Sequence, residues 1–193
     1  MKIIQEEKNS KCHHAFYFND LLYVTYLGLD KIYIYDKAYQ KIDEIKFPKN
    51  TGPRHCVLNN DKTLLYVVCE LSCEVCVIDV EMKKILQVLP ICKEKEGSSG
   101  AAIRISDDNK YLYTSCRGDN CIAVFKIEQN QLKLISYLET KETPRDFILF
   151  DDYLIVIHQD DNFIRIFHIN EEQITFVKDV NAVKELVCIK KTM

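Results

Sequence analysis

The chain has 193 residues, 47% of them hydrophobic, with no Trp and only five Gly. Its 26 basic and 29 acidic residues give a formal net charge of −3, and no basic stripe of the kind that binds nucleic acid is present. The first residues lack the apolar core of a signal peptide, and no apolar run is long enough for a transmembrane helix. We therefore expect one cytoplasmic domain whose partners include neither nucleic acid nor membrane.

A strand pair recurs along the chain. The copies are LLYVTYLGLDKIYIYD (21–36), LLYVVCELSCEVCVID (64–79), YLYTSCRGDNCIAVFK (111–126) and YLIVIHQDDNFIRIFH (153–168). They start roughly 43, 47 and 42 residues apart, and each joins two apolar or alternating strands through a short polar turn. A period in the low forties, built of short strands without a convincing helix, is typical of propeller blades. We predict an all-β chain that forms about four blades of a β-propeller.

The expected elements follow in chain order. Residues 1–12 are either a disordered leader or the remnant of a preceding strand, and residues 13–193 form the partial propeller. The strands expected in the first two blades are 13–18, 21–26, 31–35, 42–47, 54–59, 64–69, 74–80 and 84–89. After a charged, Gly/Ser-containing loop, the third blade starts with 101–106 and 111–116. The fourth starts at 143–146 and returns to 158, and a last strand at 185–189 closes the chain.

Nine cysteines are an odd number, and their setting does not suit a disulfide framework. Those that fall within expected strands are Cys56, Cys69, Cys76, Cys116, Cys121 and Cys188. Free Cys in a strand behaves as a small buried apolar residue, which is the interpretation we prefer. Cys73 and Cys76 have the spacing of half a zinc site, but no second pair follows, so metal and redox roles are the minor alternatives.

Polar residues interrupt the apolar pattern at equivalent positions of the blades. Inner strands start with Arg54-His55 and Arg145-Asp146, and the strands that follow end at Glu70, Arg117 and Gln159. In an antiparallel pair the start of one strand lies beside the end of the next, so both sets should meet at one mouth of the central channel. The residues expected at this mouth are Arg54, His55, Glu70, Arg117, Arg145 and Gln159, with Arg104 two residues deeper. The alternative is a set of solvated rim charges.

These motifs resemble the lactonase family, which includes cycloisomerase-type 6-phosphogluconolactonase and fungal carboxymuconate-lactonising enzyme. The segments that carry the resemblance are GPRH (52–55) with Glu70-Leu71, AAIRIS (101–106) with Arg117-Gly118, and TPRDF (143–147) with Gln159-Asp160. The YLGLD stretch at 26–30 is similar to the DLGxD of that family. The resemblance covers about residues 13–190 and implies a propeller of seven blades.

The chain also departs from the family pattern. It supplies about four blades and resembles the C-terminal part of the family, so the first two or three blades are expected to be missing. Where the family tends to carry Asn or Asp, this chain has Tyr26, Cys69, Cys116 and His158. An open arc leaves strand edges unpaired, which favours self-association.

The resemblance implies an enzyme, a 6-phosphogluconolactonase-like hydrolase that opens a (phospho)sugar lactone in the pentose phosphate pathway. Such a reaction needs an activated water, a stabilised oxyanion and cationic donors for a phosphate, and arginine suits both anions. The expected catalytic residues are His55, as general base or proton shuttle, Glu70, as its orienting partner or the alternative base, and Arg104. Arg54, Arg117, Arg145 and Gln159 are expected to bind substrate.

No metal or other cofactor is implied by this chemistry. Three alternatives remain open: a cycloisomerase of the muconate-lactonising type, a non-catalytic propeller that serves as a binding surface, and an inactive remnant.

Overall fold

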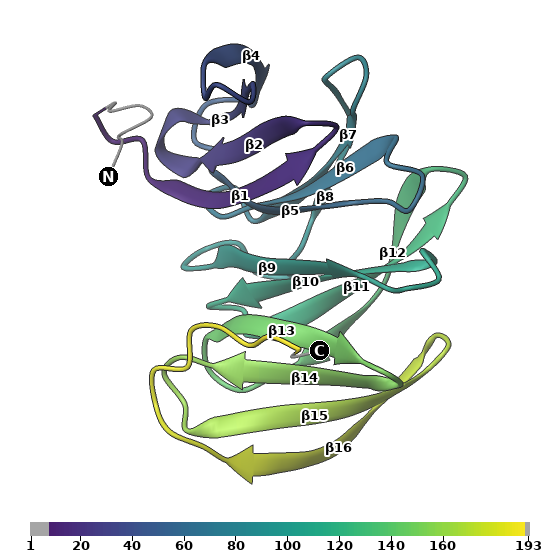
Figure 1. Cartoon of the computed structure of the whole chain (residues 1–193). Coiled ribbons are helices and arrows are strands. Elements are labelled where there is room, and N and C mark those ends of the chain that lie inside the picture. The colour runs from purple at the N-terminus through teal and green to yellow at the C-terminus, as the bar shows by residue number, and fades with distance from the viewer. Residues whose placement is uncertain (1–7, 192–193) are drawn as a thin grey trace.

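The computed structural model describes residues 8–191, and its strands form four antiparallel sheets of four strands each (Figure 1). Blade 1 contains β1 (Cys12–Phe18), β2 (Leu21–Tyr26), β3 (Lys31–Tyr35) and β4 (Lys41–Lys46), with a 3-10 turn at Leu27–Leu29. Blade 2 contains β5 (Pro53–Leu58), β6 (Leu64–Cys69), β7 (Glu74–Asp79) and β8 (Lys84–Pro90). Blade 3 contains β9 (Ser99–Ile105), β10 (Tyr111–Arg117), β11 (Cys121–Glu128) and β12 (Gln131–Glu139). Blade 4 contains β13 (Pro144–Phe150), β14 (Tyr153–His158), β15 (Phe163–Asn170) and β16 (Gln173–Asn181).

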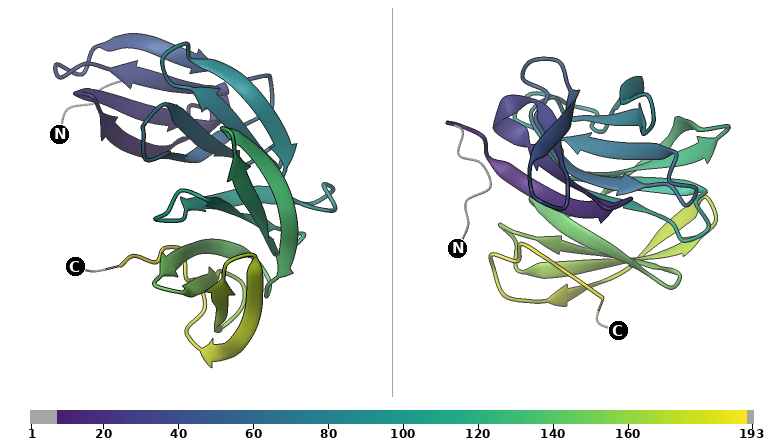
Figure 2. Two further views of the ribbon diagram at one scale, coloured as in Figure 1. Left: turned by 90° about the vertical axis from the view of Figure 1, so that its right-hand side faces the viewer. Right: turned by 45° about the horizontal axis from the view of Figure 1, so that its top comes forward.

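Each blade is a meander in which consecutive strands pair, and the first strand of every blade lies innermost. The inner strands β1, β5, β9 and β13 follow one another side by side (Figure 1). Figure 2 shows that the blades fan out as an open arc, with blades 1 and 4 at its two ends. The prediction of an all-β propeller with about four blades is confirmed.

Turn chemistry explains why the strands reverse where they do. Asn19 and Asp20, between β1 and β2, both have a positive φ (49° and 63°), as a two-residue type I′ hairpin requires. Asn59 performs a different role before β6, because its side-chain Oδ1 accepts hydrogen bonds from the backbone N–H groups of Thr63 and Leu64, both at 2.9 Å. Short polar turns of this kind fix the register of each strand pair.

The hydrophobic core lies between neighbouring blades rather than at the centre of the arc. Strand β6 shows the principle, because all six of its residues are buried and successive side chains point to opposite faces of the sheet. Leu65, Val67 and Cys69 pack towards blade 1, whereas Tyr66 and Val68 pack towards blade 3. A strand buried on both faces therefore reads as a continuous apolar run, which explains the sequence LLYVVC.

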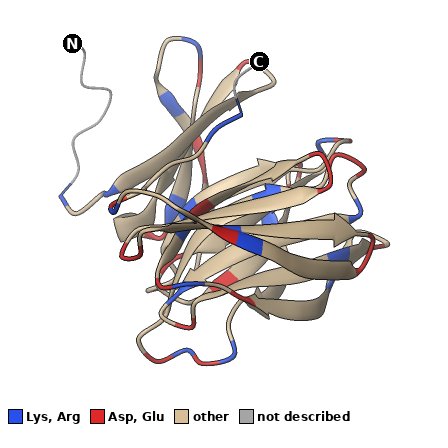
Figure 3. Ribbon diagram, turned by 90° about the horizontal axis from the view of Figure 1, so that it is seen from below, with Lys and Arg blue, Asp and Glu red and all other residues tan. Residues whose placement is uncertain are grey.

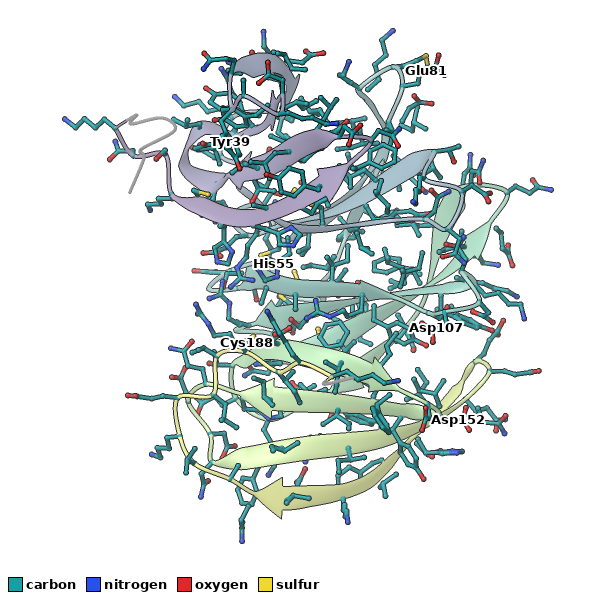
Figure 4. The ribbon with its side chains drawn as sticks, in the orientation of Figure 1. Tyr39, His55, Glu81, Asp107, Asp152 and Cys188 are labelled. Carbon is teal, nitrogen blue, oxygen red and sulfur yellow. The ribbon has the colours of Figure 1, made fainter. Side chains whose placement is uncertain are left out.

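The last predicted strand is wrong. Residues 185–189 form no strand, and Cys188, which we expected in a strand, is exposed (Figure 4). Blade 4 is already complete, and the segment contacts it through single hydrogen bonds in place of a strand ladder. Glu185 N donates to Gln159 O at 2.9 Å, and Ile189 N donates to Asp146 Oδ2 at 3.2 Å.

Charged residues of both signs are interspersed over strands and loops (Figure 3). Across residues 8–191, no helix combines the length and apolar character that crossing a membrane would need.

Candidate functional site

Each inner strand carries a β-bulge close to its start. The register against the second strand skips one residue at His13 in blade 1, at Arg54 in blade 2 and at Arg145 in blade 4. In blade 3 the irregularity falls between Gly100 and Ile103. A bulge inserts an unpaired residue and re-aims its side chain. The repeated bulge therefore directs three basic side chains from equivalent positions towards the same end of the channel.

Arg54 lies at the centre of this group, although its side chain is only 2% exposed. Its Nε donates to Glu70 Oε2 at 2.7 Å, and its Nη1 donates to the carbonyl of Ala101 on the neighbouring blade. Arg117 Nη2 approaches the same Glu70 oxygen at 3.1 Å. Burial lowers the pKa of Arg54 to about 10 while Glu70 acts in the opposite direction, so the guanidinium stays charged at neutral pH.

The loops that lead into the inner strands hold this group in place. Asp30, the last residue of the YLGLD stretch, accepts hydrogen bonds from the N–H groups of Asn50 and Gly52, both at 2.8 Å. Gly100 lets β9 approach the end of β6, because a Cβ atom there would lie 2.5 Å from the carbonyl oxygen of Cys69. Its N–H donates to Glu70 O at 3.1 Å, and its carbonyl accepts from Arg117 Nη2 at 3.1 Å.

A second ion pair spans blades 3 and 4. Arg104 Nη2 donates to Asp146 Oδ1 at 2.7 Å, and the guanidinium lies 5.6 Å from the centre of the Phe147 ring. Asp146 is 5% exposed and also accepts a hydrogen bond from the C-terminal segment at Ile189 N. Asp146 is not among the predicted site residues. Its signal was its place beside Arg145 at the start of an inner strand, the position that His55 has in blade 2.

Arg145 pairs with Gln159, its Nη1 donating to Oε1 at 2.8 Å. This contact repeats the Arg54–Glu70 contact, because Gln159 follows the second strand of blade 4 as Glu70 follows that of blade 2. Arg145 makes no direct hydrogen bond to the Arg54 group, but it is close enough to depress the pKa of Arg54 and of His13 electrostatically.

Three histidines lie in the channel beside the arginines. The ring of His55 is 4.8 Å from that of His13 and 5.3 Å from that of His14, measured between centroids. Burial, followed by the charge of Arg54, lowers the pKa of His55 to about 2. The same two effects lower the pKa of His13 to about 4. All three imidazoles are shifted towards the neutral form, and His13 and His14 were not among the predicted site residues.

The structure thus brings Arg54, Glu70 and Arg117 into direct contact and places His55 against Arg54, whose Nη1 is 3.3 Å from His55 Nδ1. It does not bring Glu70 to His55. Glu70 hydrogen-bonds the two arginines instead, so its expected contact with His55 is not formed. The reason is that Arg54 occupies the bulge between them and takes the carboxylate itself.

The positions that depart from the family pattern lie inside the blades. Tyr26, Cys69, Cys116 and His158 are all buried. Tyr26 Oη is 2.8 Å from Tyr35 Oη, and His158 accepts a hydrogen bond from the N–H of Lys141 at 3.2 Å. These residues satisfy their polar atoms within their own blades or beside them, so they do not line the mouth.

A cleft of about 930 Å³ lies at the opposite end of blades 3 and 4 and contains none of the predicted site residues. Figure 4 shows this separation, with His55 at one end of the inner strands and Asp107 and Asp152, from the cleft, at the other. Two lysines of the cleft pair with acids, Lys110 with Asp108 at 3.2 Å and Lys126 with Glu172 at 2.8 Å. We therefore regard the arginine-rich mouth as the better site for an anion.

Radial four-stranded blades define a β-propeller, and basic side chains from its inner strands gather at one mouth of the channel. The chain belongs to the lactonase family: residues 4–191 match the family described as "Lactonase, 7-bladed beta-propeller". The resemblance inferred from the motifs is confirmed.

An uncharacterized protein of Staphylococcus aureus strain USA300 is 33% identical over an alignment 196 residues long, which covers 91% of this chain and 57% of that protein. A crystal structure of a Lactobacillus plantarum protein has 26% identity and a TM-score of 0.86, with 92% of this chain and 57% of that chain covered. A candidate 6-phosphogluconolactonase from Bacteroides fragilis has 24% identity and a TM-score of 0.84, with 96% and 60% covered, and shares the fold. The chain spans less than two thirds of the length of these relatives.

Proposed function

We propose that this chain carries the anion-binding mouth of a lactone hydrolase that acts on a phosphorylated sugar lactone of the 6-phosphogluconolactone type. The observation that carries the proposal is the arginine cluster. Arg54, Arg104, Arg117 and Arg145 contribute four positive charges, which Glu70 and Asp146 offset by two. With the histidines neutral, the mouth has an excess of about two positive charges, which favours a ligand with a dianionic phosphate.

The residues have separate proposed roles. The Arg104 side chain is 33% exposed, against 15% for Arg117 and 2% for Arg54. We assign Arg104 and the half-buried Arg145 to the phosphate and to the developing oxyanion. Arg54 is buried and fully engaged, so its role is to hold Glu70 and the wall of the mouth rather than to contact substrate. This assignment changes the expectation that Arg54 binds substrate.

The proposed reaction begins with attack of a water oxygen on the lactone carbonyl carbon while a base takes the water proton. The oxyanion that forms is stabilised by guanidinium donors. The bond between the carbonyl carbon and the ring oxygen then breaks, and the ring oxygen accepts a proton to give the hydroxy acid. His55 is the proposed base because its ring is neutral. Burial and then the charge of Arg54 lower its pKa, and a bound phosphate would offset the effect of Arg54.

Hydrolysis of 6-phosphogluconolactone and of unphosphorylated gluconolactone by the purified chain tests the proposal. The assay is run at low pH, where spontaneous ring opening is slow. We expect the phosphorylated lactone to be preferred, and Arg145→Gln to reduce that preference. Binding of 6-phosphogluconate without hydrolysis would contradict the enzyme proposal and support a binding module. Neither hydrolysis nor binding would contradict both the enzyme and the binding module.

A further inference from the structure

Three cysteine side chains from two blades meet in the core between blades 2 and 3. Cys73 lies in the turn between β6 and β7, Cys92 follows β8, and Cys116 is on β10. Their Sγ atoms all lie within 4.8 Å of one another. The side chains are buried, with no more than 7% exposed for any of them. No short sequence spacing predicts this group, because its members come from three separate segments.

We propose that Cys73, Cys92 and Cys116 bind one thiophilic metal ion, with zinc as the expected ion. Sulfur atoms bound to one tetrahedral zinc at about 2.3 Å are about 3.8 Å apart. The sulfur atoms in this cluster need to move by no more than about 1 Å to reach that spacing. All three can therefore become ligands without movement of the blades.

A fourth ligand is available next to this group. Cys121 pairs directly with Cys116 across the β10–β11 ladder, although its Sγ does not lie within 4.8 Å of all three cluster sulfurs. Asp119 Oδ2 lies 3.5 Å from Cys121 Sγ. If its side chain turned towards the cluster, Cys121 would complete a tetrahedral four-sulfur set, the usual closed arrangement of a structural zinc site.

Zinc binds cysteine as the thiolate. Binding must therefore release the thiol protons, and the affinity for zinc should increase as the pH rises.

The pair Cys69 and Cys76 provides the contrast. Their Sγ atoms are 3.7 Å apart, but among residues 8–191 no third thiol, imidazole or carboxylate joins them closely enough to form a metal-binding group. Cys76 packs towards blade 1 and Cys73 towards blade 3, so the Cys73-Cys76 spacing does not form one site. Cys76 is therefore a matched control on the same blade.

A metal ion at this position would cross-link two blades directly behind the proposed catalytic mouth. Cys73 and Cys92 belong to blade 2, whereas Cys116 belongs to blade 3 and precedes Arg117 in the chain. Cys73 Sγ also lies 3.9 Å from the carbonyl oxygen of Glu70. The inference does not depend on the proposed hydrolase activity, since it concerns an ion held inside the fold.

The test measures zinc binding by the reduced chain, with the exposed Cys12 and Cys188 replaced by Ser to remove surface binding. We expect one zinc per chain, an increased thermal midpoint and X-ray absorption that shows sulfur ligands at about 2.3 Å. Cys116→Ala should weaken zinc binding more than about 100-fold. The loss of a residue that only hydrogen-bonds a metal ligand already lowers metal affinity about 10–100-fold, and Cys116 would be a ligand itself. Cys76→Ala should bind as the parent does.

Several results would overturn the proposal. They are no zinc bound by the parent chain, equal affinity in the parent and Cys116→Ala, and a disulfide between two of the cluster cysteines after purification without reductant. Circular dichroism shows whether Cys116→Ala folds. If it does not fold, the number of sulfur ligands in the parent decides, and fewer than three would refute the assignment.

Discussion

The Nε atom of Arg54 lies 2.7 Å from Glu70 Oε2, which joins a guanidinium with 2% exposure to a carboxylate at the edge of the channel. A buried charge is stable only when it is paired and its other donors are satisfied. Here the carbonyl of Ala101 accepts from the remaining side of the guanidinium, so the pair also ties blade 2 to blade 3. The pair is a structural support as well as a part of the mouth.

Removal of Glu70 should therefore destabilise the chain strongly. We expect Glu70→Ala to lower the free energy of unfolding by about 3 kcal/mol, because Arg54 keeps its buried charge without a partner. Urea unfolding followed by circular dichroism measures the change. The control is Lys37→Ala, which removes an exposed ion pair to Asp20 and should cost less than about 1 kcal/mol. Equal effects of the two substitutions would show that Arg54 is well solvated.

The stability of the chain should depend on pH through the channel histidines. The pKa values of His13 and His55 fall to about 4 and about 2 in the folded state, from about 6.5 in an unfolded chain. Below pH 6.5 the unfolded state therefore binds more protons, and the free energy of unfolding decreases as the pH falls towards those values. The slope for one histidine is at most about 1.4 kcal/mol per pH unit.

Unfolding curves at pH 7.5 and 5 measure this dependence. The free energy of unfolding should change less between pH 7.5 and pH 5 in the double variant His13→Asn with His55→Asn than in the parent. His168→Asn is the control, since His168 lies in blade 4, where it packs against Tyr153. An equal free energy of unfolding of the parent at pH 7.5 and pH 5 would contradict the buried, neutral state of the channel histidines.

The sequence predicted the blades well because strand signals are local. The apolar runs, the polar turns and the period of the strand pairs lie within short windows, and strands such as 21–26 and 64–69 begin and end at the predicted residues. The strand at 185–189 failed because the segment has the composition of a strand but forms no strand ladder with blade 4. Whether a segment becomes a strand depends on a neighbour, which local composition does not supply.

The candidate site could be predicted only in part. The antiparallel argument correctly placed Arg54, Glu70 and Arg117 together, because it uses chain direction alone. It cannot show that the bulge at Arg54 lets the Arg54 guanidinium, rather than His55, bind the Glu70 carboxylate. It also missed the Arg104–Asp146 pair, because that contact joins two blades and depends on their packing angle.

Gly100 should be irreplaceable at the blade 2–blade 3 contact. A Cβ atom at this position would lie 2.5 Å from the backbone oxygen of Cys69, so Gly100→Ala must move one of the strands. We expect a loss of about 1–3 kcal/mol in the free energy of unfolding, as for other overpacked positions. The control is Ala101→Gly, which removes a methyl group from the next residue and creates no clash. It separates the effect of crowding at Gly100 from the effect of any substitution on this strand. A neutral Gly100→Ala would show that the strands can separate freely.

Arg145 and His55 should affect catalysis in different ways if the proposed lactone hydrolysis is right. Arg145 is held by Gln159 at 2.8 Å and faces the ligand in both the ground and the transition state, so Arg145→Gln should raise KM about 10-fold or more with a smaller change in kcat. His55→Gln removes a proton acceptor that acts only in the transition state, and should lower kcat about 100-fold or more. Arg165→Gln is the control, because Arg165 pairs with Asp179 on the outer strands of blade 4. Unchanged kcat in His55→Gln would remove His55 from the mechanism and make Glu70, although held by two arginines, the remaining candidate for the base.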